Sequence, residues 1–231
     1  MFLFIHLNWV GILEAWHNLC TCNHEQYYYH MAKQTTINPA FKTLFFDYDG
    51  TLFDTKEADK YSLRNRGLRR FTPEWHQARK EYVAHIKASK PYEGWQEVFQ
   101  FIIDNNIQAA IVSGNSRQVL NMSVKACNLY DVFPKDKINR IGGTDVKGKK
   151  MWKAEGAPDL FLHALKQLNV APEDVIAFGN HTRDALAADR AGIRAVHCLW
   201  GADDEEQRQL MLADPDHECI TSPRQIIDLL R

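Results

Sequence analysis

Residues 42–53, with the sequence KTLFFDYDGTLF, decide the fold of this chain. The run from Lys42 to Phe46 is apolar and aromatic, which predicts a buried β-strand. Two carboxylates, Asp47 and Asp49, leave that strand two residues apart, and Gly50 permits the tight turn that this departure needs. Such carboxylates can share a divalent cation, or one can act as a nucleophile while the other transfers protons. Taken alone, the pair is also typical of two solvated loop residues.

Three further apolar runs predict buried strands, and helical stretches lie between them. Strands that alternate with helices predict an α/β fold, here a Rossmann-like, doubly wound parallel sheet covered on both faces. The later strands are expected at Ala109 to Val112, Asp174 to Phe178 and Arg194 to Cys198, and the helices at Trp95 to Ile103, Pro158 to Leu168, Asp184 to Ala191 and after Ser222-Pro223.

The helix expected from Trp95 to Ile103 has a clear apolar face. Its spacing predicts an inward position for Trp95, Val98, Phe99, Ile102 and Ile103.

Polar residues follow three of the four predicted strands. Ser113-Gly114-Asn115 comes after the second run, and a stretch from Gly179 through Asn180 to Asp184 comes after the third. In parallel α/β sheets, ligands bind outside the carboxyl ends of the strands. We therefore expect these residues to meet Asp47 and Asp49 at one edge of the sheet.

The composition is that of an ordinary globular protein. The chain has 231 residues, with 28 Lys and Arg against 29 Asp and Glu, which suits one large domain with a small insertion. A net charge of -1 gives no general attraction to nucleic acid or to a membrane, so neither is an expected partner. Five mostly distant cysteines favour reduced thiols and a cytoplasmic location. The oligomeric state is left open.

The first thirty residues differ in composition from the rest, because they contain no Lys or Arg. We expect residues 1–30 to be a poorly ordered extension, and Met31 is a possible translation start. The extension holds Cys20 and Cys22, but their spacing is unlike that of a zinc knuckle, which makes a metal site there the weaker interpretation. The expected organisation is a core formed by residues 31–55 and 91–231, with a small helical cap at residues 56–90.

These three motifs, and a lysine before the Pro158-Asp159 helix as a fourth, together resemble the haloacid dehalogenase superfamily of phosphohydrolases over about Thr43 to Arg231. The resemblance implies that Asp47 is a nucleophile that forms an aspartyl-phosphate, and that Asp49 is the general acid and base. It also implies a Mg²⁺ cofactor and a small anionic phosphate ester as substrate, as in phosphoglycolate phosphatases. The implied phosphate ligands are Ser113, Gly114, Asn115 and Lys153, and the implied metal ligands are Asp47, Asp49 through its backbone carbonyl, Asn180 and Asp184.

Two positions depart from the family pattern. Asn180 stands where the family usually has Asp, which keeps an oxygen ligand but removes a negative charge, so weaker Mg²⁺ binding is expected. The lysine usually lies three residues before the proline of the following helix, a place that Glu155 occupies here. Lys153 is the preferred candidate because a long side chain can absorb a small register change. Lys147, Lys149 and Lys150 remain alternatives.

The insertion between the first two motifs resembles a small helical cap. Between Lys56 and Lys90 there are ten basic and four acidic residues, a net charge of +6. A positive lid over a phosphate site would attract anionic substrates, although basic residues on exposed helices are usually only solvated. The expected packed side of the cap consists of Trp75, Tyr82, Val83 and Ile86.

The predicted function is a Mg²⁺-dependent phosphatase. A sugar-phosphate mutase is a chemical alternative, but it needs a cap that re-presents a bisphosphate intermediate, and this insertion is small. A dehalogenase is disfavoured, because that branch does not need the acid that Asp49 supplies. Asn180 and the displaced lysine also leave open a non-catalytic binding or regulatory protein on the same scaffold.

Overall fold

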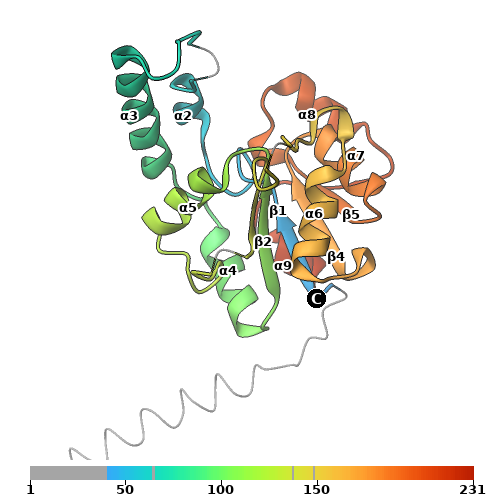
Figure 1. The fold of residues 1–231 in the computed structure, drawn as a ribbon. Helices are drawn as coiled ribbons and strands as arrows, with labels where there is room; N and C mark the ends of the chain where they lie inside the picture. Colours follow the sequence, from blue (N-terminus) through green and yellow to red (C-terminus); the bar gives the residue numbers. More distant parts are fainter. Residues whose placement is uncertain (1–40, 64–65, 137, 148) are drawn as a thin grey trace, which may run out of the picture. The chain divides into compact units, whose positions relative to one another are not determined.

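The fold is known from a computed structural model, which describes residues 41–63, 66–136, 138–147 and 149–231. The expectations for residues 1–30, and those for residues 31–40, lie outside this part of the chain. Within it, six parallel strands form one sheet in the order β3-β2-β1-β4-β5-β6 (Figure 1). The strands are β1 (Thr43–Phe46), β2 (Gln108–Ser113), β3 (Arg140–Gly142), β4 (Val175–Gly179), β5 (Arg194–Cys198) and β6 (Glu218–Ile220).

The helices connect these strands in the way that parallel pairing requires. The predicted α/β fold with a doubly wound, Rossmann-like sheet is therefore confirmed. The helices are α2 (Lys56–Lys60), α3 (Pro73–Ala88), α4 (Trp95–Asp104), α5 (Arg117–Ala126), α6 (Asp159–Leu168), α7 (Thr182–Arg190), α8 (Glu205–Leu212) and α9 (Gln225–Leu229).

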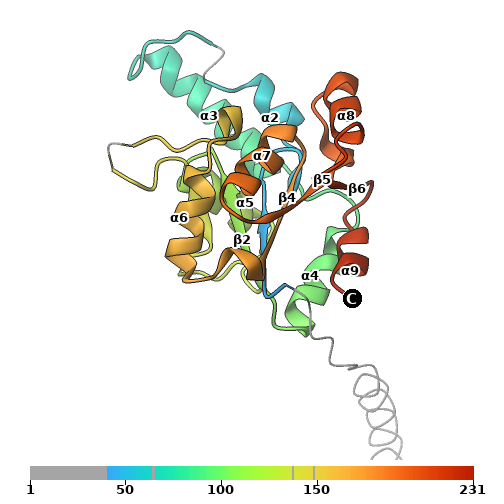
Figure 2. The same ribbon diagram turned by 90° about the vertical axis from the view of Figure 1, so that its right-hand side faces the viewer.

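Two cores lie on opposite faces of the sheet, because successive strand residues point to opposite sides. In β1, Phe45 packs with α6 and α7, whereas Phe46 packs with α4, α5 and α9. Figure 2 shows these two layers of helices on either side of the strands. The interior side chains are apolar, so the polar residues that follow the strands are left at the sheet's edge.

One expected core position is wrong. Ile103 is 42% exposed, whereas Trp95, Val98 and Ile102 are almost fully buried. At 100° per residue, Ile103 lies at the margin of the apolar stripe of α4, where the helix turns toward solvent.

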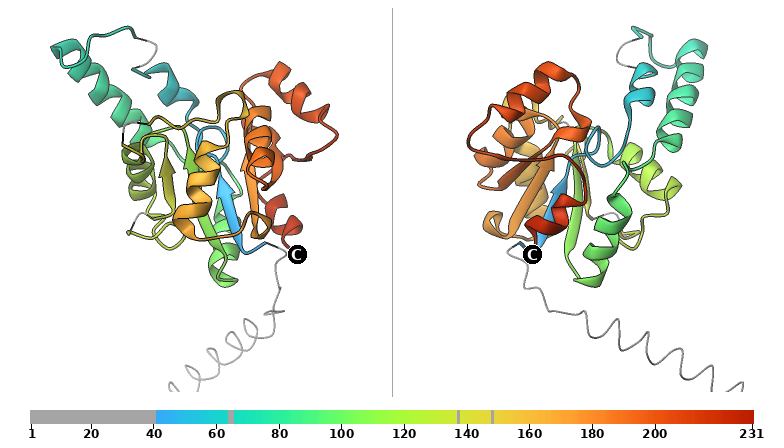
Figure 3. Two further views of the ribbon diagram at one scale, coloured as in Figure 1. Left: turned by 45° about the vertical axis from the view of Figure 1, so that its right-hand side comes forward. Right: turned by 180° about the vertical axis from the view of Figure 1, so that it is seen from behind.

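Helices α2 and α3 occupy most of the predicted cap segment. Figure 3 shows α3 beside α5, and the Ser123 hydroxyl on α5 donates to the Ile86 carbonyl at 3.4 Å. Of the four side chains expected to pack inward, Ile86 is fully buried and the other three are partly buried. In the part of the chain that the structure describes, every helix is too short or too polar to cross a membrane.

Candidate active site

A cavity of about 390 Å³ lies at the carboxyl ends of β1, β2 and β4. Parallel strands end at the same edge of a sheet, so three distant parts of the chain meet there. All eight residues proposed from the sequence line this cavity, namely Asp47, Asp49, Ser113, Gly114, Asn115, Lys153, Asn180 and Asp184.

The two aspartates that follow β1 share one side of the chain because the residue between them faces the core. Tyr48 is fully buried, and its hydroxyl lies 2.6 Å from the Ser123 hydroxyl. The Asp47 N–H donates to the Phe178 carbonyl at 2.9 Å, which continues the pairing of β1 with β4 past the end of β1. Gly50 then turns the chain with a φ of +73°, a conformation that favours glycine.

Lys153 holds the centre of the site. Its ammonium contacts the Asp47 carboxylate and lies 2.8 Å from Asp184 Oδ1. Burial alone would lower the pKa of Lys153, but the two carboxylates raise it above its ordinary value. Among the alternative lysines, Lys149 pairs with Asp159 at the surface, and the Lys150 ammonium lies over the Trp152 ring.

A short 3-10 turn, Ala154–Gly156, delivers Lys153 to the site. Glu155 adopts the left-handed φ of 53° within this turn. The Arg190 guanidinium of α7 donates to the carbonyls of Glu155 and Gly156 at 2.7 and 2.9 Å. This anchored turn allows a lysine five residues before Pro158, rather than three, to reach Asp47.

The Asp49 carboxylate is fixed by two neighbours. The Thr55 hydroxyl donates to one oxygen at 2.9 Å, and the Asn115 side-chain amide donates to the other at 2.6 Å. Burial, together with the nearby Asp47 and Asp59 charges, raises the pKa of Asp49 to about 7. A carboxyl with this pKa can give up a proton and take it back near neutral pH.

Asp47 titrates differently from Asp49, because a cation lies beside it. Burial raises the pKa of Asp47 to about 6, the Lys153 charge opposes this rise, and the Asp184 charge adds to it. The site therefore holds more negative charge than its lysine neutralises.

Asn180 is buried and bridges two loops. Its side-chain amide donates to the Gly201 carbonyl at 2.7 Å, and its oxygen accepts from the Thr51 hydroxyl at 3.0 Å. An amide oxygen has two lone pairs, so one remains for another ligand. A carboxylate could not make the first of these bonds, which gives a structural reason for Asn at this position.

The donor set fits a hard divalent cation. The carboxylates of Asp47 and Asp184 line the cavity together with Asp49 and Asn180. Oxygen donors of this kind are what Mg²⁺ prefers, and a dication would reduce the repulsion between these crowded carboxylates.

Four residues that line the cavity were not among the site residues proposed from the sequence. Asp203 follows β5, and the rule of looking after each apolar run pointed to that edge. Asp59 belongs to α2, and its arrival at the cavity depends on how the cap packs. Arg183 and Trp152 also line the cavity, together with Asp59 and Asp203.

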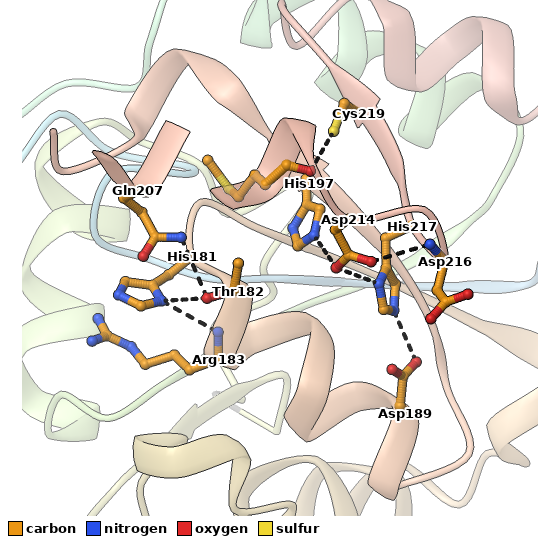
Figure 4. A network of polar contacts seen from close by, with 11 residues as sticks. His181, Thr182, Arg183, Asp189, His197, Gln207, Asp214, Asp216, His217 and Cys219 are labelled. Carbon is orange, nitrogen blue, oxygen red and sulfur yellow. Dashed lines mark hydrogen bonds and ion pairs between the residues drawn. The ribbon is translucent and has the colours of Figure 1, made fainter. Parts of the chain in front are cut away.

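His181, which lies inside the fourth motif, has a structural contact. Its ring Nδ1 accepts from the Arg183 N–H at 3.2 Å and caps the start of α7 (Figure 4). This cap helps to set the direction in which α7 presents Asp184 to Lys153.

Comparison with known proteins agrees with this geometry. The family model for haloacid dehalogenase-like hydrolases matches residues 60–198, more than half of the chain, although the match begins after Asp47 and Asp49. The chain belongs to this hydrolase family. No protein of curated function gives a significant match.

Solved structures share the fold at low identity. A provisionally assigned phosphatase from Clostridium difficile superposes with a TM-score of 0.63 at 20% identity, covering 83% of this chain and 99% of that one. A provisionally assigned β-phosphoglucomutase from Thermotoga maritima gives 0.60 at 20% identity, with 82% and 98% covered. A provisionally assigned phosphoglycolate phosphatase from Lactobacillus plantarum gives 0.57 at 18% identity, with 82% and 99% covered.

Proposed function

We propose that this hydrolase is a Mg²⁺-dependent phosphatase that cleaves a small phosphate monoester through an aspartyl-phosphate intermediate. The observation that carries the proposal is the contact between the Asp47 carboxylate and the buried Lys153 ammonium at the cavity, with Asp49 beside them. A carboxylate held against a cation at the end of a strand is a suitable nucleophile for a phosphorus atom.

In the first step, a carboxylate oxygen of Asp47 attacks phosphorus, and the bond from phosphorus to the ester oxygen breaks. Asp49 gives its proton to the departing alcohol oxygen, which the raised pKa of Asp49 allows near neutral pH. Lys153 offsets negative charge on the nucleophile and the phosphoryl group.

In the second step, the Asp49 carboxylate takes a proton from a water molecule, and the water oxygen attacks phosphorus. The bond between phosphorus and Asp47 breaks, which releases inorganic phosphate and restores both side chains. The Asn115 and Thr55 hydrogen bonds keep Asp49 in position through both steps.

Phosphoryl oxygens would be held at the end of β2. The Ser113 hydroxyl and the backbone amides of Gly114 and Asn115 are suitable donors there. Ser113 is almost fully buried, and its hydroxyl oxygen accepts from the Asn115 N–H at 3.2 Å, which leaves the Ser113 O–H to donate. This bond would open when the Asn115 N–H donates to a phosphoryl oxygen instead.

Mg²⁺ would be held by the carboxylates of Asp47 and Asp184, the Asp49 backbone carbonyl and the remaining lone pair of Asn180. When bound, the ion would neutralise charge on the phosphoryl oxygens and reduce repulsion between the carboxylates.

The substrate would be a small anion, as phosphoglycolate is. A cavity of about 390 Å³ is near the lower end of the usual size for ligand sites. Arg183 is a cation at its lining, whereas Asp59 is the cap residue that lines it among those the structure describes. Steering by the basic cap would therefore act at a distance, and a fall of kcat/KM with rising ionic strength for a multiply charged substrate would reveal it.

The direct test is hydrolysis of p-nitrophenyl phosphate by the purified chain with Mg²⁺. Asp47→Asn should abolish turnover, whereas Asp54→Asn, the same change at an exposed aspartate nearby, should leave it nearly unchanged. A rapidly acid-quenched reaction should show a phosphoryl group on Asp47 by mass spectrometry. Absence of turnover with Mg²⁺, Mn²⁺ and Co²⁺ on a panel of phosphate esters would favour a non-catalytic protein, and isomerised sugar phosphate without phosphate release would favour a mutase.

A further inference from the structure

Two histidines and two aspartates form a second polar cluster away from the proposed active site (Figure 4). His197 Nε2 lies 3.0 Å from Asp214 Oδ2, and His217 Nδ1 lies 2.9 Å from the same oxygen. The other ring nitrogen of His217 lies 3.0 Å from Asp189 Oδ1. We call the four residues the histidine cluster.

The members come from separate parts of the fold that are each held in place. His197 lies in β5 and is 1% exposed, and His217 directly precedes β6. Asp189 belongs to α7. The Asp214 carboxylate is oriented by the Asp216 N–H, which donates to Oδ1 at 3.1 Å and leaves Oδ2 directed toward both imidazoles.

Three of these side chains form a compact ligand set. One donor atom from each of His197, Asp214 and His217 lies within 4.8 Å of the others. In a tetrahedral zinc site with bonds of about 2.0–2.2 Å, neighbouring ligand atoms are about 3.3 Å apart. The two nitrogen–oxygen distances of 2.9 and 3.0 Å would therefore need to increase by only a few tenths of an ångström.

The surroundings also suit a metal. A histidine that binds a metal usually donates its second N–H to a carboxylate, and Asp189 accepts in that position from His217. The Asp214 side chain is 22% exposed, so solvent reaches this carboxylate, and a water molecule would be the fourth ligand. Two imidazoles and a carboxylate are typical ligands of Zn²⁺ rather than of Mg²⁺.

The nearby Cys219 is not needed in the ligand set. It lies opposite His197 in the pairing of β5 with β6, and its thiol donates to the Met211 carbonyl at 3.3 Å. The site would thus contain nitrogen and oxygen ligands without a thiolate.

We propose that His197, Asp214 and His217 bind a Zn²⁺ ion that fastens the segment before β6 to β5, with Asp189 orienting His217. For Zn²⁺ to bind, His197 Nε2 and His217 Nδ1 must each be without a proton. An imidazolium would release that proton to solvent, and a neutral imidazole would move it to its other ring nitrogen. In His217 the other nitrogen carries the proton that is donated to Asp189. The site is structural and does not depend on the proposed phosphatase activity.

The test uses the full chain with Co²⁺ as a spectroscopic substitute for Zn²⁺. The first thirty residues contain thiols and imidazoles that could bind metal, so the reference protein carries His6→Ala, His17→Ala, Cys20→Ser, Cys22→Ser, His24→Ala and His30→Ala. Saturating Mg²⁺ occupies the proposed active site. One equivalent of Co²⁺ should give the strong visible absorption of tetrahedral coordination, without a thiolate charge-transfer band, and Zn²⁺ should displace it.

Variants of the reference protein locate the ion. His217→Gln and His197→Gln should remove the cobalt signal, whereas His76→Gln, at an exposed histidine of α3, should keep it. Asp47→Asn should also keep it, which separates this site from the proposed Mg²⁺ site. Asp189→Asn replaces a half-exposed side chain that is not a ligand, and it should weaken Zn²⁺ binding about tenfold or more without unfolding the chain.

The proposal is overturned if the reference protein gives no tetrahedral signal, or if a folded His197→Gln or His217→Gln variant keeps the signal. Should a histidine variant fail to fold, as judged by circular dichroism, the affinity of the Asp189 variant decides. Unaltered affinity in Asp189→Asn would then count against the site.

Discussion

Helix α7 carries one carboxylate of each of two charge clusters. The carboxylates of one cluster are paired with a lysine, and those of the other with histidines. Asp184, in its first turn, shares the Lys153 ammonium with Asp47. Asp189, in its last turn, faces His217, which also contacts Asp214. The first cluster has a cation that stays charged at neutral pH, whereas the second relies on imidazoles.

This difference separates what each cluster can do. A permanent buried cation suits a site that receives an anionic substrate, because its charge does not change with modest changes of pH. Burial lowers the pKa of His217, but its hydrogen bonds to Asp189 and Asp214 raise it above the ordinary value. Under the proposal above, Zn²⁺ would compete with protons for the imidazoles of the histidine cluster, and the raised pKa of His217 makes that competition harder as the pH falls.

The largest effect is expected when the permanent cation is removed. Lys153→Met leaves the buried Asp47 and Asp184 carboxylates without their partner, so turnover should be lost and the free energy of unfolding should fall by about 3 kcal/mol. Lys149→Met removes the exposed pair with Asp159 and should cost under about 1 kcal/mol. Urea unfolding measures both losses of free energy, and equal losses would contradict the claim that Lys153 neutralises two buried carboxylates.

A smaller effect is expected when a negative charge is added to the same cluster. Asn180→Asp cannot donate to the Gly201 carbonyl, and without metal the free energy of unfolding should fall by about 1–3 kcal/mol. Mg²⁺ should recover part of this loss, because a carboxylate is a stronger ligand than an amide. Urea unfolding with and without Mg²⁺ tests this prediction. If Mg²⁺ stabilises the variant and the wild type by the same amount, Asn180 is not a ligand of the metal.

The smallest effect is expected in the metal-free histidine cluster. A histidine with a raised pKa in the folded state stabilises the fold below its unfolded pKa of about 6.5, and the contribution is lost as pH rises through the folded-state value. With EDTA present, His217→Gln should therefore lower the melting temperature more at about pH 6 than at about pH 9. A penalty that does not vary with pH would show that His217 contributes packing rather than charge.

The prediction of the edge of the sheet succeeded because it required only local patterns. Apolar runs such as Thr43–Phe46 specify buried strands, and parallel strands necessarily place their carboxyl ends together. The eight proposed site residues thus line one cavity although they span positions 47 to 184. The short strands β3 and β6 and the helix α8 were not predicted, because three-residue strands and weakly amphipathic helices have little local signal. Helix α5 was also missed, although Ser116 caps its start and Val119, Leu120 and Val124 share its buried face.

The sequence by itself determined the alternation of strands and helices and the motifs that follow β1, β2 and β4, because these depend on residue type and short spacing. Only the tertiary structure decided between Lys153 and its neighbours, since the choice depends on a turn that Arg190 anchors from α7. It also decided that Asp59 and Asp203 reach the cavity. The histidine cluster had no motif at all: its members are brought together by the packing of α7, β5 and the segment before β6, which residue spacing does not specify.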